Sequence, residues 1–158
     1  MTPSVRILGP DFLDGLAAAA AATPRRRRNS NLHADAACPC QRFFNALQAD
    51  TYVPPHRHLD AAKDETLVVL RGRLGAVIFA PDGQAVSAHV LRPGMVADVP
   101  HATYHSWLAL EDGTVFFEAK AGPYLPLTTE ERAPFAPPEG DPRAPAYLAW
   151  MKSLCADA

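Results

Sequence analysis

The sequence predicts a single all-β domain, an antiparallel sandwich or barrel with a short helix at each end. Between residues 41 and 122, short strand-like segments are separated by Gly/Pro turns, and no helical segment lies between them. Two of these turns, Pro81-Asp82-Gly83 and Glu111-Asp112-Gly113, predict hairpins, because glycine tolerates the positive φ that such turns require. The chain of 158 residues has the length of one domain and shows no linker that would separate two.

The expected strands alternate with these turns. The clearest is residues 65–70, a nearly continuous run of β-branched residues and leucine that ends at Arg71-Gly72. In chain order, the expected strands are residues 43–47, 51–53, 65–70, 75–79, 86–91, 95–99, 103–110 and 114–119.

A helix is expected on each side of the strands. Asp11 can cap the first helix, which continues through an alanine run and ends at Pro24. The second helix is expected from Asp141, its cap, and Pro142 through Leu154. We therefore divide the domain into a helix and arm packed on the barrel (1–40), the barrel itself (41–122), and a Pro-rich tail with the last helix (123–158).

Composition and charge exclude several function classes. The formal net charge of -2 gives no general attraction to nucleic acid or to anionic membranes. The Ala17–Ala22 run is preceded by acidic and followed by basic residues, the reverse of a signal peptide, and no apolar run is long enough to span a bilayer. We therefore expect a cytoplasmic protein whose three cysteines are reduced thiols.

Three histidines and one glutamate are the candidate metal ligands. His56 and His58 are two residues apart, so on a strand both side chains would project to the same face. His105 lies on a later expected strand, and Glu65 begins the strand between them. Imidazoles and a carboxylate from adjacent strands can converge on a divalent ion and leave positions open for water or substrate. A lone histidine is more often a hydrogen-bonded or surface residue, so the prediction depends on the whole set.

The spacing of this set resembles the first motif of the cupin superfamily. That motif runs His-x-His, a short gap, Glu, six residues and Gly, which here is His56-Arg57-His58, Glu65 and Gly72. The gap of six residues between His58 and Glu65 is longer than the usual three or four. Glu65 is therefore either a direct ligand or a group that orients one.

The second cupin motif is also present. It runs Gly, five residues, Pro-x-Gly, two residues and His, and here Gly94, Pro100 and His105 match it. Ala102 stands at the second glycine, a mild departure if the turn does not need positive φ. The resemblance implies a single-domain cupin, a jelly-roll β-barrel, with one divalent transition metal ion. Three histidines and a carboxylate do not distinguish zinc, nickel, manganese, cobalt and iron(II).

A narrower resemblance, to the WbuC family of cupin-fold metalloproteins, covers most of the chain. It is carried by residues 31–33, 45–47, 52–58, 63–65, 70–72, 117–124 and 135–141. That family is associated with bacterial surface-polysaccharide gene clusters. The resemblance implies a metal-binding cupin with a small sugar-like or anionic ligand. We also expect a homodimer.

Further side chains are candidates for the ligand site. Arg28, Asn31 and His33 follow the first helix and could fold over the barrel mouth, where the fork of an arginine suits phosphate or carboxylate. The alternative is a hydrated basic arm that orders nothing. Trp107 could line the pocket, although aromatic residues in barrels are more often core.

Lys63 and Tyr52 are the candidate catalytic residues. Lys63 lies two residues before Glu65 and could act in the mouth as an acid or an anion anchor, or be an exposed surface lysine. Tyr52 could line the pocket or belong to the core.

Two classes of function fit these residues. The first is a metalloenzyme, with isomerisation or epimerisation of a sugar or sugar nucleotide as the leading reaction and a dioxygenase as its rival. The second is a non-catalytic, metal-dependent protein that binds a small carbohydrate or organic acid.

Overall fold

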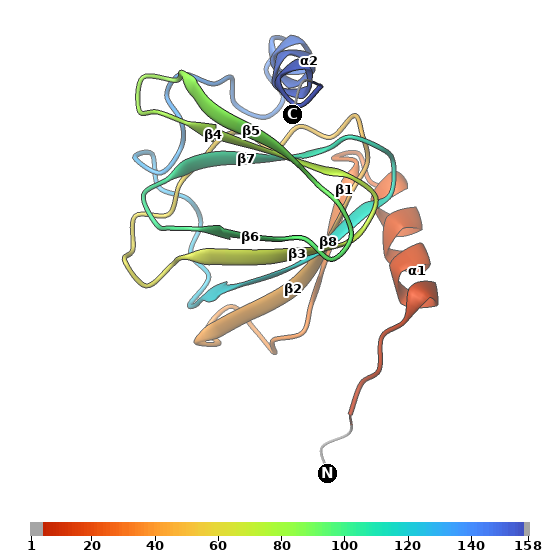
Figure 1. Ribbon diagram of the computed structural model, residues 1–158. Coiled ribbons are helices and arrows are strands. Elements are labelled where there is room, and N and C mark those ends of the chain that lie inside the picture. The colour runs from red at the N-terminus through yellow and green to blue at the C-terminus, as the bar shows by residue number, and fades with distance from the viewer. Residues whose placement is uncertain (1–4, 157–158) are drawn as a thin grey trace.

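Two antiparallel sheets stack on each other, with one helix beside each (Figure 1). This computed structural model describes residues 5–156, so the first four residues of the expected arm and the last two of the tail lie outside it. The five-stranded sheet consists, in spatial order, of β1 (Arg27–Asn31), β2 (Cys40–Leu47), β8 (Thr114–Ala121), β3 (Glu65–Arg71) and β6 (Val96–Val99). The three-stranded sheet consists of β5 (Ala85–Leu91), β4 (Leu74–Phe79) and β7 (Tyr104–Ala109). The predicted all-β architecture is confirmed.

The main core lies between the two sheets. Along β3 the side chains alternate, so that Glu65, Leu67 and Val69 are buried on the inward face. Leu67 and Val69 pack against Trp107 of β7 and Phe116 of β8. Each fully buried aliphatic side chain of this kind contributes about 1.5–3 kcal/mol of hydrophobic free energy. Glu65 is the one charged member of this inward row of β3, and the apolar residues beside it fix its place.

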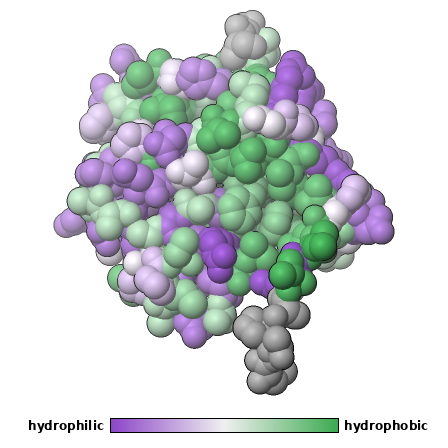
Figure 2. All heavy atoms as spheres, turned by 60° about the horizontal axis from the view of Figure 1, so that its bottom comes forward, coloured by the Kyte–Doolittle hydropathy of each residue, from purple (hydrophilic) through white to green (hydrophobic). Residues whose placement is uncertain are grey.

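The two helices cover the outer faces of the sheets. Helix α1 (Pro10–Ala21) buries Leu16 and Ala20 against Ala46 and Val115 of the five-stranded sheet. Helix α2 (Ala144–Leu154) buries its apolar side, including Met151, in a second cluster with residues of β4 and β7. In residues 5–156, no helix has the length and apolar character needed to cross a bilayer. Figure 2 shows apolar side chains gathered on the side of the molecule that is at the bottom of Figure 1.

Strand β1 was not expected from the sequence. Its residues, Arg-Arg-Asn-Ser-Asn, contain no apolar side chain and therefore show no hydrophobic period. The strand exists because its backbone pairs with β2, from Arg27 opposite Leu47 to Asn31 opposite Phe43. The sheet thus begins at residue 27 and not at residue 41.

Three other expectations about the elements are wrong. Residues 51–53 form no strand, because Thr51 is held by a turn, and its hydroxyl donates a hydrogen bond to the Arg25 carbonyl. Helix α1 starts at Pro10, which suits the first helical position because it lacks an N–H, so Asp11 lies in the first turn and is no cap. Helix α2 starts at Ala144, after a turn in which the Asp141 carboxylate accepts a hydrogen bond from the Arg143 N–H.

Candidate metal centre

The three predicted histidines lie together at one end of the barrel interior. The ring centroids are 4.8 Å apart for His56 and His105, 5.4 Å for His56 and His58, and 6.3 Å for His58 and His105. His56 and His58 do not lie on a regular strand, contrary to expectation. Instead, the backbones of His56 and His105 exchange two hydrogen bonds of 2.9 and 3.0 Å, an isolated bridge to the start of β7. This bridge places the His-x-His segment beside His105.

Backbone carbonyls orient two of the imidazoles. His56 Nδ1 donates to the Pro54 carbonyl at 3.0 Å, and His105 Nδ1 donates to the Thr103 carbonyl at 2.9 Å. Because a carbonyl only accepts, each ring carries its hydrogen on Nδ1 and presents an unprotonated Nε2 when neutral. Burial, and then the neighbouring His105, lower the pKa of His56 to about 3, so this ring is neutral at physiological pH.

His105 Nε2 is the most informative atom of the group. It is buried and has no hydrogen-bond partner among the described residues. Its nearest carboxylate oxygen, Glu65 Oε1, lies 3.7 Å away, too far for a hydrogen bond. Burial lowers the pKa of His105, but the Glu65 carboxylate outweighs it and the net shift is upward. An unpartnered buried nitrogen is costly, so this atom points to a missing partner.

Glu65 is held from both sides. Its Oε1 accepts a 2.8 Å hydrogen bond from Trp107 Nε1, and its Oε2 lies 3.2 Å from His58 Nε2. The same Oε2 accepts a 3.1 Å hydrogen bond from Lys120 Nζ. Burial raises the pKa of Glu65, but Lys120 and the histidines outweigh it and hold the pKa well below its ordinary value. The carboxyl group is therefore a buried anion.

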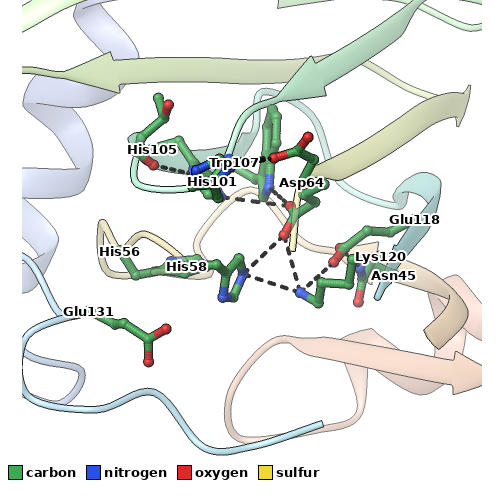
Figure 3. Close-up of polar contacts among 12 residues, drawn as sticks. Asn45, His56, His58, Asp64, His101, His105, Trp107, Glu118, Lys120 and Glu131 are labelled. Atoms are coloured by element: carbon green, nitrogen blue, oxygen red, sulfur yellow. Dashed lines mark hydrogen bonds and ion pairs between the residues drawn. The ribbon is translucent and has the colours of Figure 1, made fainter. Parts of the chain in front are cut away.

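The sequence analysis missed three residues, Lys120, Glu118 and Asn45, that extend the polar contacts of Glu65. Lys120 Nζ lies 2.7 Å from Glu118 Oε1, an ion pair whose geometry is not that of a hydrogen bond, and 3.4 Å from His58 Nε2. Glu118 Oε2 accepts a 2.8 Å hydrogen bond from Asn45 Nδ2. The dashed lines around Lys120 in Figure 3 show these contacts. Glu118 and Lys120 follow Phe116 in the inward row of β8, as two charges two residues apart in a mostly apolar strand, and this pattern could have identified them.

The pKa values of Glu118 and Lys120 are both raised. Burial, and next the Glu65 carboxylate, raise the pKa of Glu118 to about 7. Burial lowers the pKa of Lys120, but Glu118 and Glu65 outweigh it and the pKa lies above its ordinary value. Lys120 is therefore a buried ammonium group beside Glu65.

The donor chemistry of this cluster fits a transition metal, but its present arrangement does not. Imidazoles with Nδ1 fixed by carbonyls, an unpartnered Nε2 and a buried carboxylate are the donors that zinc and similar ions take. Yet within residues 5–156 no three His, Cys, Asp or Glu side chains are positioned so that they could hold an ion as they stand. Lys120 contacts two of these side chains, at Glu65 Oε2 and His58 Nε2.

A cavity of about 830 Å³ opens onto this cluster. The structure brings the predicted ligand-site residues together here, because Arg28, Asn31, His33 and Trp107 line the cavity with His56 and Glu65. Strand β1 carries Arg28 and Asn31 to its wall. No hydrogen bond or ion pair holds the Arg28 guanidinium within the part of the chain that is described. The basic segment is thus an ordered wall of the cavity.

The neighbouring arginines are tied to the C-terminal tail. Glu139 accepts hydrogen bonds from Arg25 at 2.7 and 2.9 Å and from Arg27 at 2.9 Å. Both arginines also line the cavity. Their charges are already balanced in part, so Arg28 is the guanidinium left for a ligand.

The two predicted catalytic residues lie in different surroundings. Lys63 lines a smaller pocket of about 190 Å³ together with His58 and Lys120. Tyr52 is buried in the core, and its hydroxyl donates a 2.8 Å hydrogen bond to the Pro137 carbonyl. Burial raises the pKa of Tyr52. Tyr52 is not among the residues that line the cavity, and its side chain packs in the core cluster beside α2.

The second cupin motif has a conformational cost at Ala102. Its φ is 62°, so the turn does require the left-handed region, and the alanine is more than a mild departure. The Ala102 N–H donates a 2.6 Å hydrogen bond to the His58 carbonyl, which ties the turn to the His-x-His segment. Neighbouring His101 is exposed and bonded to Asp64 at 2.9 Å, away from the centre.

Comparison with known protein families identifies the family of this chain. Residues 8–91, more than half of the chain, match the family described as a domain of unknown function, DUF6016. The chain belongs to DUF6016. The matched part of this DUF6016 protein includes His56, His58 and Glu65, whereas His105, Glu118 and Lys120 lie beyond it. No curated protein matches the sequence.

Solved structures share the fold of this DUF6016 protein. Pumpkin pro-11S globulin is 19% identical with a TM-score of 0.53, over 65% of this chain and 27% of the globulin. An oxalate oxidase in complex with glycolate is 17% identical with a TM-score of 0.50, over 64% of this chain and 53% of the oxidase. KdgF from Halomonas sp. is 18% identical with a TM-score of 0.49, over 64% and 82% of the two chains. The predicted cupin fold is confirmed, and the resemblance to the WbuC family stays a prediction.

Proposed function

We propose that this DUF6016 protein is a metal-binding cupin that holds one divalent transition metal ion through His56, His58, His105 and Glu65. The observation that carries the proposal is the buried His105 Nε2, which has no partner among the described residues and lies next to two other imidazoles and a carboxylate. When bound, such an ion polarises a carbonyl or hydroxyl group, or activates water, at its open positions.

The residues of the chain define what the ligand must be like. The cavity of about 830 Å³ is large enough for a sugar-sized molecule. Arg28 and Asn31 offer hydrogen-bond donors from its wall, and the Arg28 charge favours an anionic group. Trp107 adds an apolar surface to the lining of the same cavity. The proposed ligand is therefore a small, anionic, sugar-like molecule.

The leading reaction is isomerisation or epimerisation of such a sugar or sugar nucleotide. It requires groups that carry a proton to and from carbon, and Lys120 and Glu118 both line the cavity beside Glu65. Lys63 remains a candidate for the same work from the smaller pocket beside His58. A place in bacterial surface-polysaccharide metabolism is the expectation from the WbuC resemblance.

The metal part of the proposal is tested by elemental analysis of purified protein. About one transition-metal ion per chain is expected for the wild-type protein and much less for His105→Ala. Wild-type protein that binds no transition metal under saturating conditions would contradict the proposal.

The reaction is tested separately, with the metal-loaded protein in deuterated water. An isomerase or epimerase exchanges a carbon-bound hydrogen of a hexuronic acid with solvent, which NMR detects. A dioxygenase would instead consume oxygen, and a non-catalytic binding protein would bind the hexuronic acid without either change. The expected cytoplasmic location and homodimer stay predictions.

A further inference from the structure

The ammonium group of Lys120 contacts two of the four proposed metal donors. Its Nζ lies 3.1 Å from Glu65 Oε2 and 3.4 Å from His58 Nε2. The third contact, 2.7 Å to Glu118 Oε1, is the shortest. The Lys120 side chain is 16% exposed, so these contacts are made almost out of water.

The same two donor atoms cannot serve the lysine and a metal ion at once. A transition metal binds histidine nitrogen and carboxylate oxygen at about 2.0–2.2 Å, which uses the lone pairs that the ammonium now faces. In addition, His58 Nε2 lies 3.2 Å from Glu65 Oε2 and 3.4 Å from Lys120 Nζ, so it either donates to the carboxylate or accepts from the ammonium group. Each of these contacts occupies the atom that a metal ion would need. The lysine must therefore move before this nitrogen can bind an ion.

We propose that Lys120 closes the metal centre: its ammonium group and the metal ion are alternative cations for Glu65 and His58. Loading of the ion moves Lys120 off these two residues and leaves it on Glu118. This inference rests on the proposed metal function and concerns how the same centre is regulated.

Glu118 is suited to keep the displaced lysine. It makes the shortest contact with Lys120, and Asn45 holds its other oxygen at 2.8 Å, so the carboxylate keeps its place when the lysine shifts. Among the described residues, Lys120 contacts His58 but makes no hydrogen bond to His56 or His105, whose Nδ1 atoms are bonded to backbone carbonyls. An ion is therefore expected to meet these two rings first.

The charge balance links metal loading to the ligand. Without a metal, the single positive charge of Lys120 faces two buried carboxyl groups, Glu65 and Glu118. With a divalent ion on neutral histidines and Glu65, and Lys120 paired with Glu118, the centre has a net positive charge facing the cavity. The displaced ammonium also has N–H groups to donate. An anionic ligand is therefore expected to bind the loaded protein better than the metal-free protein.

The test is a zinc titration of the chelator-treated full-length protein, wild type against Lys120→Met. Removal of the competing cation should tighten zinc binding, by a factor in the roughly 5–150-fold range that coupled sites show. Metal-free Lys120→Met should also melt lower than wild type and gain more in Tm from zinc. Lys152→Met is the matched control, because Lys152 bonds the Ala49 carbonyl outside the centre. Equal or weaker zinc binding by Lys120→Met would overturn the inference.

A second variant keeps the test decisive if Lys120→Met does not fold. Lys120→Gln retains donors for the two carboxylates without the charge, and it too should bind zinc more tightly than wild type. A double-mutant cycle that combines Lys120→Met with Glu118→Gln adds a readout that a purely structural lysine would not give. Glu118→Gln should weaken zinc binding more in the wild-type protein than in the Lys120→Met variant. If no variant and no wild type binds zinc, the metal proposal fails; if wild type binds and Lys120 is neutral to binding, only this inference fails.

Discussion

The Trp107 indole donates a 2.8 Å hydrogen bond to Glu65 Oε1 and so joins the two sheets at the candidate centre. Trp107 lies on β7 of the three-stranded sheet and Glu65 on β3 of the five-stranded sheet. Both side chains are at most 4% exposed, so the bond is made inside the core. It uses one carboxylate oxygen and leaves the other, Oε2, to face a cation. The core thus aims the carboxylate before any ion is bound.

The first prediction concerns the histidines. Replacement of His105 or His58 by alanine should remove most of the bound metal, because each change deletes one imidazole donor. The barrel should stay folded, since its core lies elsewhere between the sheets. Metal per chain by elemental analysis and far-UV circular dichroism check the two parts. His89→Ala, an exposed position on β5, is the control, and full metal occupancy in both variants would refute the assignment.

The second prediction concerns the carboxylate. Glu65→Gln should weaken metal binding by about 10–100-fold even if the residue only orients a histidine, and by more if it is a ligand. The amide loses the negative charge but keeps an oxygen for the Trp107 N–H. Glu130→Gln, a change at an exposed residue outside the cavity, is the control. Affinity equal to wild type in a competition titration with a chelator would place Glu65 outside the metal chemistry.

The fold and the candidate ligand set could be proposed from the sequence because each leaves a pattern in it. Inward alternation and turns specify the strands, and the histidine spacing specifies the set around Glu65. Strand β1 has no hydrophobic pattern in the sequence, because its residues are polar and pair with β2 through backbone groups. The His-x-His segment is held by an irregular bridge, which no strand periodicity describes.

Lys120 shows why site chemistry is harder to predict than site ligands. In sequence, its charge two residues after Glu118 shows only that two charged side chains share one face of a strand. Only the pairing of β8 with β3, which sets Lys120 opposite Glu65, shows that the ammonium group reaches the candidate centre. Conversely, the sequence made Tyr52 a candidate for the pocket, whereas in the structure its hydroxyl is bonded to the Pro137 carbonyl of the tail.

The third prediction concerns the turn of the second motif. Ala102 adopts a φ of 62°, which costs an L-residue with a side chain about 1–2 kcal/mol. Ala102→Gly should relieve this cost. Because glycine is also more flexible in the unfolded chain, part of the gain is offset, and we expect the free energy of unfolding to rise by up to about 1 kcal/mol. Urea denaturation measures the free energy of unfolding. Exposed Ala85→Gly on β5 is the contrast and should destabilise, and a destabilised Ala102→Gly would show that the turn is not strained.

The fourth prediction concerns pH and the tie between the arm and the tail. Partial burial raises the pKa of Glu139, but hydrogen bonds from Arg25 and Arg27 outweigh it and lower the pKa from 4.5 to about 2. A carboxyl group whose pKa is lower in the folded state stabilises the fold at a pH above its pKa in the unfolded chain. This contribution is lost as the pH falls through its pKa in the folded state. Glu139→Gln should therefore lower the Tm at neutral pH, and the difference from wild type should shrink between pH 4.5 and about 2. A difference independent of pH would mean that the ion pairs contribute nothing.

The last prediction concerns the wall of the cavity formed by β1. Arg28, Asn31 and His33 line the cavity, yet none is among the proposed metal donors. Replacing Arg28 by alanine, or Asn31 and His33 together, should therefore leave the metal content unchanged and weaken binding of a hexuronic acid. Loss of a charged hydrogen bond to a carboxylate corresponds to about 1.5–3 kcal/mol, or roughly 10–150-fold in affinity for Arg28→Ala.

Isothermal titration of the metal-loaded protein with a hexuronic acid and with the matching neutral hexose separates charge recognition from general fit. Arg28→Ala should lose affinity for the acid and little for the neutral sugar, because only the carboxylate meets the guanidinium. Exposed Arg92→Ala lies outside this cavity and is the control for net charge. Unchanged binding of the acid by both wall variants would leave β1 as a purely structural edge strand, and the ligand would then have to reach the centre past Lys63 through the smaller pocket beside His58.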